Sequence, residues 1–322
     1  MPGLNVLAAP FLMLAAVRSI LRRGDVAAVM VYNFDPSLVV ITLYLKFFFD
    51  GVLLQNVEDV SEPRFADWMP GSRARPLQQL LFWICMHVIA RMVHGYVIPT
   101  RRFLAYLPSR KKQAVITGCI DIQAELSAAD PPPLRVLYAG KIEPEHGSVA
   151  FLEALKLLDG MDAPPQIEVD ISGRSTNCVG LEAELSELRH IRARSHGFVS
   201  KQAYRDLLSQ AHVCLALQDP KGRYADFKTP SKVYEFLAFG KAVVSTNVGD
   251  IAEIGEKVLV LLPELSGAAL AAAIGRLAKD PATAVALREA ALRYAEQHFS
   301  YAAVGEVLCA LISSEVQKCS SK

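Results

Sequence analysis

The chain has 322 residues, a length at which a single hydrophobic core usually gives way to two domains. Lys and Arg total 34 against 33 Asp and Glu, and this balance argues against a surface whose main purpose is to bind nucleic acid. The 6 cysteines lie far apart and form no CxxC or His/Cys cluster, which indicates reduced thiols and excludes a disulfide framework or a zinc site.

Two apolar stretches near the N-terminus, 4–21 and 77–95, have to be weighed as membrane spans. Arg18 interrupts the first, and its positive charges lie at the wrong end for a signal peptide. The second contains polar residues such as Gln79 and Arg91, which are typical of a packed helix. The sequence therefore favours peripheral attachment to a membrane over a transmembrane span.

In the first part of the chain, short apolar runs alternate with helical patterns. The expected strands are 26–33, 52–57, 96–99 and 114–118, and the expected helices are 37–49, 77–94 and 101–107. Three consecutive prolines at 131–133 then mark a linker. Strands that alternate with helices indicate βαβ units and a parallel sheet.

A second series of the same kind follows the prolines. Its expected strands are 135–140, 167–173, 213–218, 242–247 and 258–262, and its expected helices include 147–158, 180–190 and 201–210, with further helices to the end. Two series joined by a linker predict two Rossmann-like domains. Ligands of open parallel sheets bind outside the carboxyl ends of the strands, so the site is expected in the cleft between the domains.

The stretch "TPSKVYEFLAFGKAVVSTNVGD" (229–250) predicts a helix with unusual polar residues at its start. Thr229 suits the N-cap, Pro230 suits the first helical position, and Gly240 suits the left-handed residue after the end. Lys232 and Glu235 lie off the apolar stripe of this helix. A helix N-terminus beside a lysine suits a phosphate, and a glutamate one turn further in suits the hydroxyls of a ribose.

Three segments at the ends of expected strands are rich in glycine, hydroxyl groups and lysine or arginine, which suits a phosphate. They are "AGKIEPEHG" (139–147), "SGRSTN" (172–177) and "DPKGRYADFKTPSK" (219–232). Together with "HGFVSKQAYRDLLSQAHVCLALQ" and "HFSYAAVGEVLCAL", they stand in an order that resembles the group 1 (family 4) glycosyltransferases with the GT-B fold. These are retaining enzymes that use nucleotide-sugar donors. The resemblance covers roughly 134–311.

The resemblance implies an α/β fold with two Rossmann-like domains, in which the last helix crosses back to the first domain. The corresponding limits are 1–130 for an incomplete acceptor-side domain, 131–298 for the donor-binding domain and 299–322 for the returning helix. The first domain lacks the opening strands of the family. The resemblance therefore predicts a misplaced start, or a partner polypeptide or membrane surface that covers the bare edge of the strand 26–33.

The site residues come from the same resemblance. It assigns Lys141 and Lys232 to the donor diphosphate and Glu235 to the ribose hydroxyls, as the catalytic set. The other donor-binding residues that it implies are Gly140, His146, Gly173, Arg174, Thr229, Pro230, Ser231 and Gly249. Asn33, Glu58 and Asp59 are expected on the acceptor side. No metal and no cofactor is implied. The chain departs from the family at Phe227, which stands where the first of two paired glutamates is usual, and at His146, where lysine is usual.

The predicted function is transfer of a sugar from a nucleoside-diphosphate sugar to a glycan or lipid-linked acceptor, with retention of configuration. The expected setting is cell-surface polysaccharide synthesis in a bacterium, in the cytoplasm or on the inner face of the membrane. Two alternatives stay open. One is a nucleotide-sugar-binding or assembly subunit without full catalysis, and the other is a two-domain nucleotide-sugar epimerase. Glu235 also has a purely structural interpretation, a surface ion pair with Lys232 at i, i+3.

Overall fold

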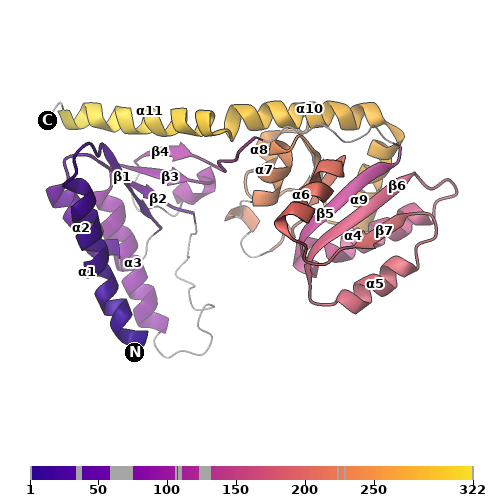
Figure 1. The fold of residues 1–322 in the computed structure, drawn as a ribbon, viewed down its shortest axis with the longest axis horizontal. Coiled ribbons are helices and arrows are strands. Elements are labelled where there is room, and N and C mark those ends of the chain that lie inside the picture. The colour runs from indigo at the N-terminus through magenta and orange to yellow at the C-terminus, as the bar shows by residue number, and fades with distance from the viewer. Residues whose placement is uncertain are drawn as a thin grey trace. The chain divides into compact units, whose positions relative to one another are not determined.

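The computed structural model describes residues 2–33, 38–58, 75–105, 107, 111–122, 132–222, 225–227 and 230–320. The chain divides into two compact units. Unit 1 consists of Met1–Thr117 and Gly305–Lys322, and unit 2 of Gly118–Val304. Each unit contains its own parallel sheet (Figure 1). The predicted fold class, α/β with two parallel sheets, is confirmed, while the domain limits given above stay a prediction.

Unit 1 is built on a sheet of four parallel strands in the order β1-β2-β3-β4. The strands are β1 (Ala28–Tyr32), β2 (Val52–Asn56), β3 (Gly95–Ile98) and β4 (Lys112–Val115). Each forms within or close to a predicted apolar run. The central strands β2 and β3 are almost fully buried, as their apolar residues require, whereas β1 and β4 at the edges are partly exposed. β1 is an edge strand, and its register with β2 runs from Ala28↔Val52 to Tyr32↔Asn56.

Three α-helices accompany this sheet: α1 (Pro2–Leu21), α2 (Val39–Phe48) and α3 (Arg75–Met92), with a 3-10 helix, η3 (Arg101–Ala105), before β4. In Figure 1 the three helices extend from one side of the sheet. α2 contacts both α1 and α3. It buries Ile41, Thr42 and Leu45, which lie on one side of the helix.

The last helix, α11 (Tyr301–Ser320), belongs largely to unit 1. Its Leu311 packs in a buried cluster with Val52, Leu54, Val97 and Ala114 of the sheet. The carboxylate of Glu315, 7% exposed, lies 3.7 Å from Lys112 Nζ. These contacts confirm that the C-terminal helix returns to the first sheet.

Unit 2 is built on six parallel strands in the order β10-β9-β8-β5-β6-β7. The strands are β5 (Leu134–Ile142), β6 (Ile167–Ser175), β7 (Arg192–Ser195), β8 (Val213–Ala216), β9 (Ala242–Thr246) and β10 (Val260–Leu262). The sequence did not predict β7, because its residues "RARS" carry no apolar pattern. Its pairing with β6 fixes it at the edge of the sheet.

Helices cover both faces of the second sheet. They are α4 (Ser148–Asp159), α5 (Cys178–Ser186), α6 (Lys201–Gln210), α7 (Ser231–Ala238), α8 (Ile251–Ile254), α9 (Gly267–Lys279) and α10 (Pro281–His298), with 3-10 helices η4 (Pro144–His146) and η5 (Ala225–Phe227). Val136 and Tyr138 of β5 join one buried cluster, whereas Leu137 and Ala139 join another. This alternation is what a strand between two helical layers requires.

Among the described residues, one stretch, Pro281–Val316, is long and apolar enough to cross a membrane by length and composition alone. It comprises α10 and most of α11. Ala291, Ala295 and Phe299 of this stretch lie in a core cluster of unit 2, and Leu311 lies in the core of unit 1. These four residues therefore pack in the cores of the two units.

Candidate functional site

The helix predicted from residue 229 onward is α7. Pro230 is its N-cap residue, with φ −70° and ψ 91°, so the helix begins at Ser231, one residue later than predicted. The predicted N-cap, Thr229, lies outside the described residues. Gly240 has φ +60°, and its N–H donates to the Leu237 carbonyl at 2.9 Å. The predicted left-handed end of the helix is therefore confirmed.

Three polar side chains meet beside α7. Lys232 Nζ donates to Glu235 Oε2 at 2.8 Å and to the Tyr204 hydroxyl at 2.8 Å. The Tyr204 hydroxyl in turn donates to Glu235 Oε2 at 3.1 Å. The structure thus brings the predicted Lys232 and Glu235 together as an i, i+3 pair. Sequence reasoning missed Tyr204, which comes from α6 and is joined to α7 only by tertiary packing.

The side chains of Lys232 and Glu235 keep hydrogen-bonding groups that are available to a ligand. Lys232 and Glu235 are 36% and 30% exposed. Both bonds to Glu235 use Oε2, so its Oε1 faces no donor in these contacts. An ammonium has three protons, and the two bonds of Lys232 use two of them. Burial, then the negative charge of Glu235, raises the pKa of Tyr204 above its usual range, which keeps its hydroxyl a donor.

A second group of predicted residues lies at the carboxyl ends of β5 and β6. Gly140 pairs in register with Gly173, and Lys141 pairs with Arg174. A Cβ on Gly173 would lie 1.7 Å from the Gly140 carbonyl oxygen, so only glycine fits there. Lys141 and Arg174 are both exposed. Two cations side by side at an exposed strand end are suited to bind an anion such as a phosphate.

The turn after β5 positions His146. Its Nδ1 lies 3.8 Å from Glu143 Oε2, and its carbonyl accepts a hydrogen bond of 2.6 Å from the Tyr138 hydroxyl. Glu143, Glu145 and His146 bring ligand atoms within 4.8 Å of one another, which makes them the group among the described residues that could hold a metal ion. The turn is fixed by Gly147, which has φ +82° and packs against Leu217.

Gly249 contacts η5, the short helix that precedes α7 in the chain. The N–H of this predicted donor-side residue donates to the Ala225 carbonyl at 2.8 Å. Ala225 begins η5, which ends at Phe227. Phe227 is half-buried and Asp226 is exposed. Phe227, which departs from the family pattern, therefore lies on a turn that a hydrogen bond joins to the segment after β9.

The acceptor-side prediction falls on unit 1. Asn33, at the end of β1, has φ +51°, and its Oδ1 accepts from the N–H of Glu58 at 2.8 Å. The Glu58 carboxylate accepts from the Tyr32 hydroxyl at 3.0 Å and from Asn56 Nδ2 at 3.1 Å. The structure thus brings Asn33 and Glu58 together. Asp59 lies outside the described residues.

Sequence reasoning missed the neighbours of this pair, and above all Gln55. Its side chain is 0% exposed and donates to the carbonyls of Asn33 at 2.6 Å and of Asn56 at 3.1 Å. A fully buried amide that links the ends of two adjacent strands fixes the loop conformations there. The sequence signal that could have revealed this role was a single glutamine, Gln55, within an otherwise apolar run.

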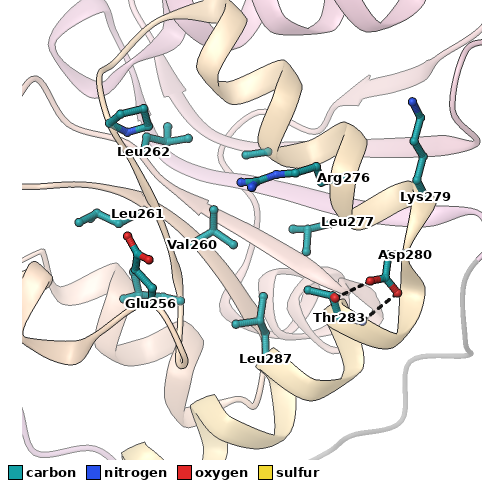
Figure 2. Close-up of a pocket in the computed structure, with 13 residues that line it drawn as sticks. Glu256, Val260, Leu261, Leu262, Arg276, Leu277, Lys279, Asp280, Thr283 and Leu287 are labelled. Atoms are coloured by element: carbon teal, nitrogen blue, oxygen red, sulfur yellow. Dashed lines mark hydrogen bonds between the residues drawn. The ribbon is translucent and has the colours of Figure 1, made fainter.

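A hollow in unit 2 lies away from these residues. It has a volume of about 830 Å³ and is bounded by β10, α9 and α10. Figure 2 shows apolar side chains such as Val260, Leu277 and Leu287 around it, with the Asp280–Thr283 hydrogen bonds at one side. Those bonds cap the start of α10. None of the predicted site residues lines this hollow.

The architecture of both units matches solved structures. Sucrose-phosphate synthase from Thermosynechococcus elongatus is 17% identical with a TM-score of 0.61, covering 94% of this chain and 78% of that chain. The Anabaena protein HepE, solved with UDP, is 16% identical with a TM-score of 0.64, covering 94% and 82%. A glycosyltransferase from Rickettsia africae is 14% identical with a TM-score of 0.63, covering 94% and 80%. These likenesses show the fold, which is GT-B.

A family model matches part of the sequence. Residues 133–280 match the family described as glycosyl transferases group 1. This segment runs from β5 through α9 and contains every donor-side residue predicted above. The predicted resemblance to the group 1 glycosyltransferases is therefore confirmed for this segment of the chain. No curated protein matches the chain as a relative.

Proposed function

We propose that the protein transfers a hexosyl group from a UDP-sugar to a hydroxyl of a glycan or lipid-linked acceptor, with retention of configuration and without a metal ion. The acceptor belongs to a bacterial cell-surface polysaccharide. The observation that carries the proposal is the carboxyl edge of the unit 2 sheet, where Lys141 pairs with Arg174 and Lys232 meets Glu235.

The choice of donor rests on the chemistry of this edge and on proteins of the same fold. HepE has been solved with UDP and with UDP-glucose, and TarM of S. aureus with UDP. In the present chain Lys141 and Arg174 contact the diphosphate, and Lys232 gives its third proton to a phosphate oxygen. Glu235 accepts from the ribose hydroxyls through Oε1, while Oε2 keeps its bonds to Lys232 and Tyr204.

The reaction breaks the bond between the anomeric carbon and the diphosphate oxygen, and UDP leaves with the electron pair. The acceptor hydroxyl oxygen forms the new bond on the same face of the sugar and releases its proton. UDP-sugar and acceptor thus give glycosylated acceptor, UDP and one proton. The cations act on the charge that develops on the departing diphosphate, where such preorganised groups accelerate a reaction most.

On the acceptor side we assign the polar cluster at the ends of β1 and β2. Asn33 and Glu58 lie together there, and buried Gln55 fixes their loops. Amide and carboxylate groups of this kind bind sugar hydroxyls by hydrogen bonds. The glycan is positioned by these groups, and positioning alone lowers a transfer barrier substantially.

One specific observation favours a second candidate, a nucleotide-sugar-binding subunit without catalysis. Phe227 stands where the family usually has a glutamate, and the structure places it half-buried on η5. Such a protein would bind a UDP-sugar through Lys232 and Glu235 and would release no UDP. Binding and turnover therefore have to be measured separately.

Glu235→Ala tests the proposed donor site. Loss of hydrogen bonds to a carboxylate costs roughly 1.5–3 kcal/mol, so the affinity for UDP should fall about tenfold to hundredfold in calorimetry. Glu289→Ala is a matched control, because Glu289 lies 3.6 Å from Arg293 in an exposed i, i+4 pair on α10. The control should leave UDP affinity unchanged. Equal affinities for UDP in wild type and Glu235→Ala would refute the assignment.

A further inference from the structure

The helices of unit 1 expose large apolar side chains to solvent. The most exposed are Phe11 at 68%, Leu12 at 70%, Phe47 at 73% and Phe48 at 71%. We call the exposed large apolar residues of these helices the apolar helix surface: Phe11, Leu12, Met13 and Ile20 of α1, Val40, Phe47 and Phe48 of α2, and Leu80, Trp83 and Ile84 of α3. A concentration of this kind in one part of a protein marks an interaction site.

The pattern along α3 is that of an amphipathic helix with an apolar outer stripe. Leu80, Trp83, Ile84, His87 and Arg91 are spaced at i, i+3, i+4, i+7 and i+11, which places them along one face. Ile89 and Ala90 near its C-terminal end are 0% exposed and form its buried side. The Trp83 and His87 rings are tilted against each other, with centroids 4.0 Å apart. The buried side already supplies the packing that the fold needs, so the outer stripe is surplus to it.

Residues 11–21 of α1 also expose more apolar side chains than they bury. Of residues 11–21, only Leu14, Val17 and Leu21 are half-buried, and their spacing forms a single contact stripe. The other apolar residues in this range face solvent. In Figure 1 both α1 and α3 continue past the sheet.

The charges on these helices have one sign. α1, α2 and α3 contain no Asp or Glu, whereas Arg18, Lys46 and Arg91 lie on them. Arg22 and Arg23 follow directly after α1, and both are exposed. The Arg18 guanidinium lies 5.8 Å from the centre of the Tyr44 ring. Apolar side chains, Trp and Tyr at the boundary and cations without carboxylates are the composition that binds an anionic membrane surface.

We propose that the apolar helix surface binds the surface of an anionic lipid bilayer. Trp83, Ile84, Phe11 and Leu12 enter the acyl boundary, and the arginines and Lys46 contact lipid phosphates. This surface is separate from the proposed donor site on unit 2 and does not depend on the proposed reaction. It places the protein at a membrane, where a lipid-linked acceptor is found.

The test is sedimentation of the full chain with vesicles of phosphatidylcholine, with and without phosphatidylglycerol. The protein should sediment with the anionic vesicles, and high salt should weaken binding because it screens the charges. Trp83→Ser with Ile84→Ser should reduce binding by roughly tenfold or more, since each removes a large apolar side chain from the boundary. Arg22→Glu with Arg23→Glu should reduce binding to anionic vesicles by roughly tenfold or more.

Leu157→Ser with Met161→Ser is the matched control, because these residues are 50% and 40% exposed on unit 2. This variant should bind vesicles as the wild type does. Circular dichroism and UDP affinity should be unchanged in every variant, which separates lost membrane binding from unfolding or a damaged donor site. The proposal is overturned if neither vesicle binds. It is also overturned if light scattering shows a dimer that the Trp83 and Ile84 substitutions dissociate, because a second copy would then cover the surface.

Discussion

Gly173→Ala should be one of the most damaging single-methyl additions in unit 2. The new Cβ would lie 1.7 Å from the Gly140 carbonyl oxygen and 2.7 Å from its carbonyl carbon, both of which are backbone atoms that no side-chain rotation can move. Gly173 also has φ +150°, a conformation that alanine adopts only under strain. β5 and β6 would have to separate at their carboxyl ends, where Lys141 pairs with Arg174.

Gly140→Ala separates the two causes of this loss. Gly140 has φ +134°, but a Cβ there meets no atom within 4 Å, so this variant carries backbone strain without a clash. Strain of this kind costs about 1–3 kcal/mol, and overpacking adds about 1–3 kcal/mol. Gly173→Ala should therefore lose about 2–6 kcal/mol in urea unfolding, and Gly140→Ala about 1–3 kcal/mol. Equal losses in the two variants would refute the close approach of the strands.

Three further predictions concern other parts of the two units. Tyr204→Phe should lower the affinity for UDP up to about tenfold in calorimetry, because the Lys232–Glu235 pair loses a shared hydroxyl partner; unchanged affinity would show that the hydroxyl has no positioning role. Lys232→Ala should weaken UDP binding more than uridine binding, since its partner is a phosphate, and equal losses would contradict that role. Burial, then the charges of Lys46 and Lys111, lowers the pKa of His94 below its ordinary value of 6.5. The unfolded chain is then protonated first as the pH falls, so the free energy of unfolding should decrease below pH 6.5 and His94→Gln should reduce that slope; an unchanged slope would count against it.

The local part of the site could be predicted from the sequence. Lys232 and Glu235 are three residues apart on one helix, and helical geometry brings such residues together whatever the rest of the fold does. Gly240 ends the same helix because few other residues adopt a positive φ cheaply. Both features depend on residues that are close together in the chain, so they can be predicted from the sequence.

The non-local part could not be predicted. Tyr204 reaches Lys232 and Glu235 from another helix, and only tertiary packing decides which residue of α6 lies there. The pairing of Gly140 with Gly173 depends on the register of two strands, which an apolar run does not specify to the residue. Gln55 lies in an apolar strand and donates hydrogen bonds to the carbonyls of Asn33 and Asn56, at the ends of two adjacent strands. Its role therefore becomes visible only when both strand ends are placed.

The central claim is that the carboxyl edge of the unit 2 sheet binds a UDP-sugar and promotes transfer. The most direct measurement is the release of nucleoside diphosphate from UDP-, GDP- and ADP-sugars by wild type, Lys232→Ala and the control Glu289→Ala. The account predicts release from a UDP-sugar by wild type and control, and a large loss in Lys232→Ala. Tight UDP-sugar binding without release would identify a binding subunit, and neither binding nor release with any nucleotide sugar would contradict the account altogether.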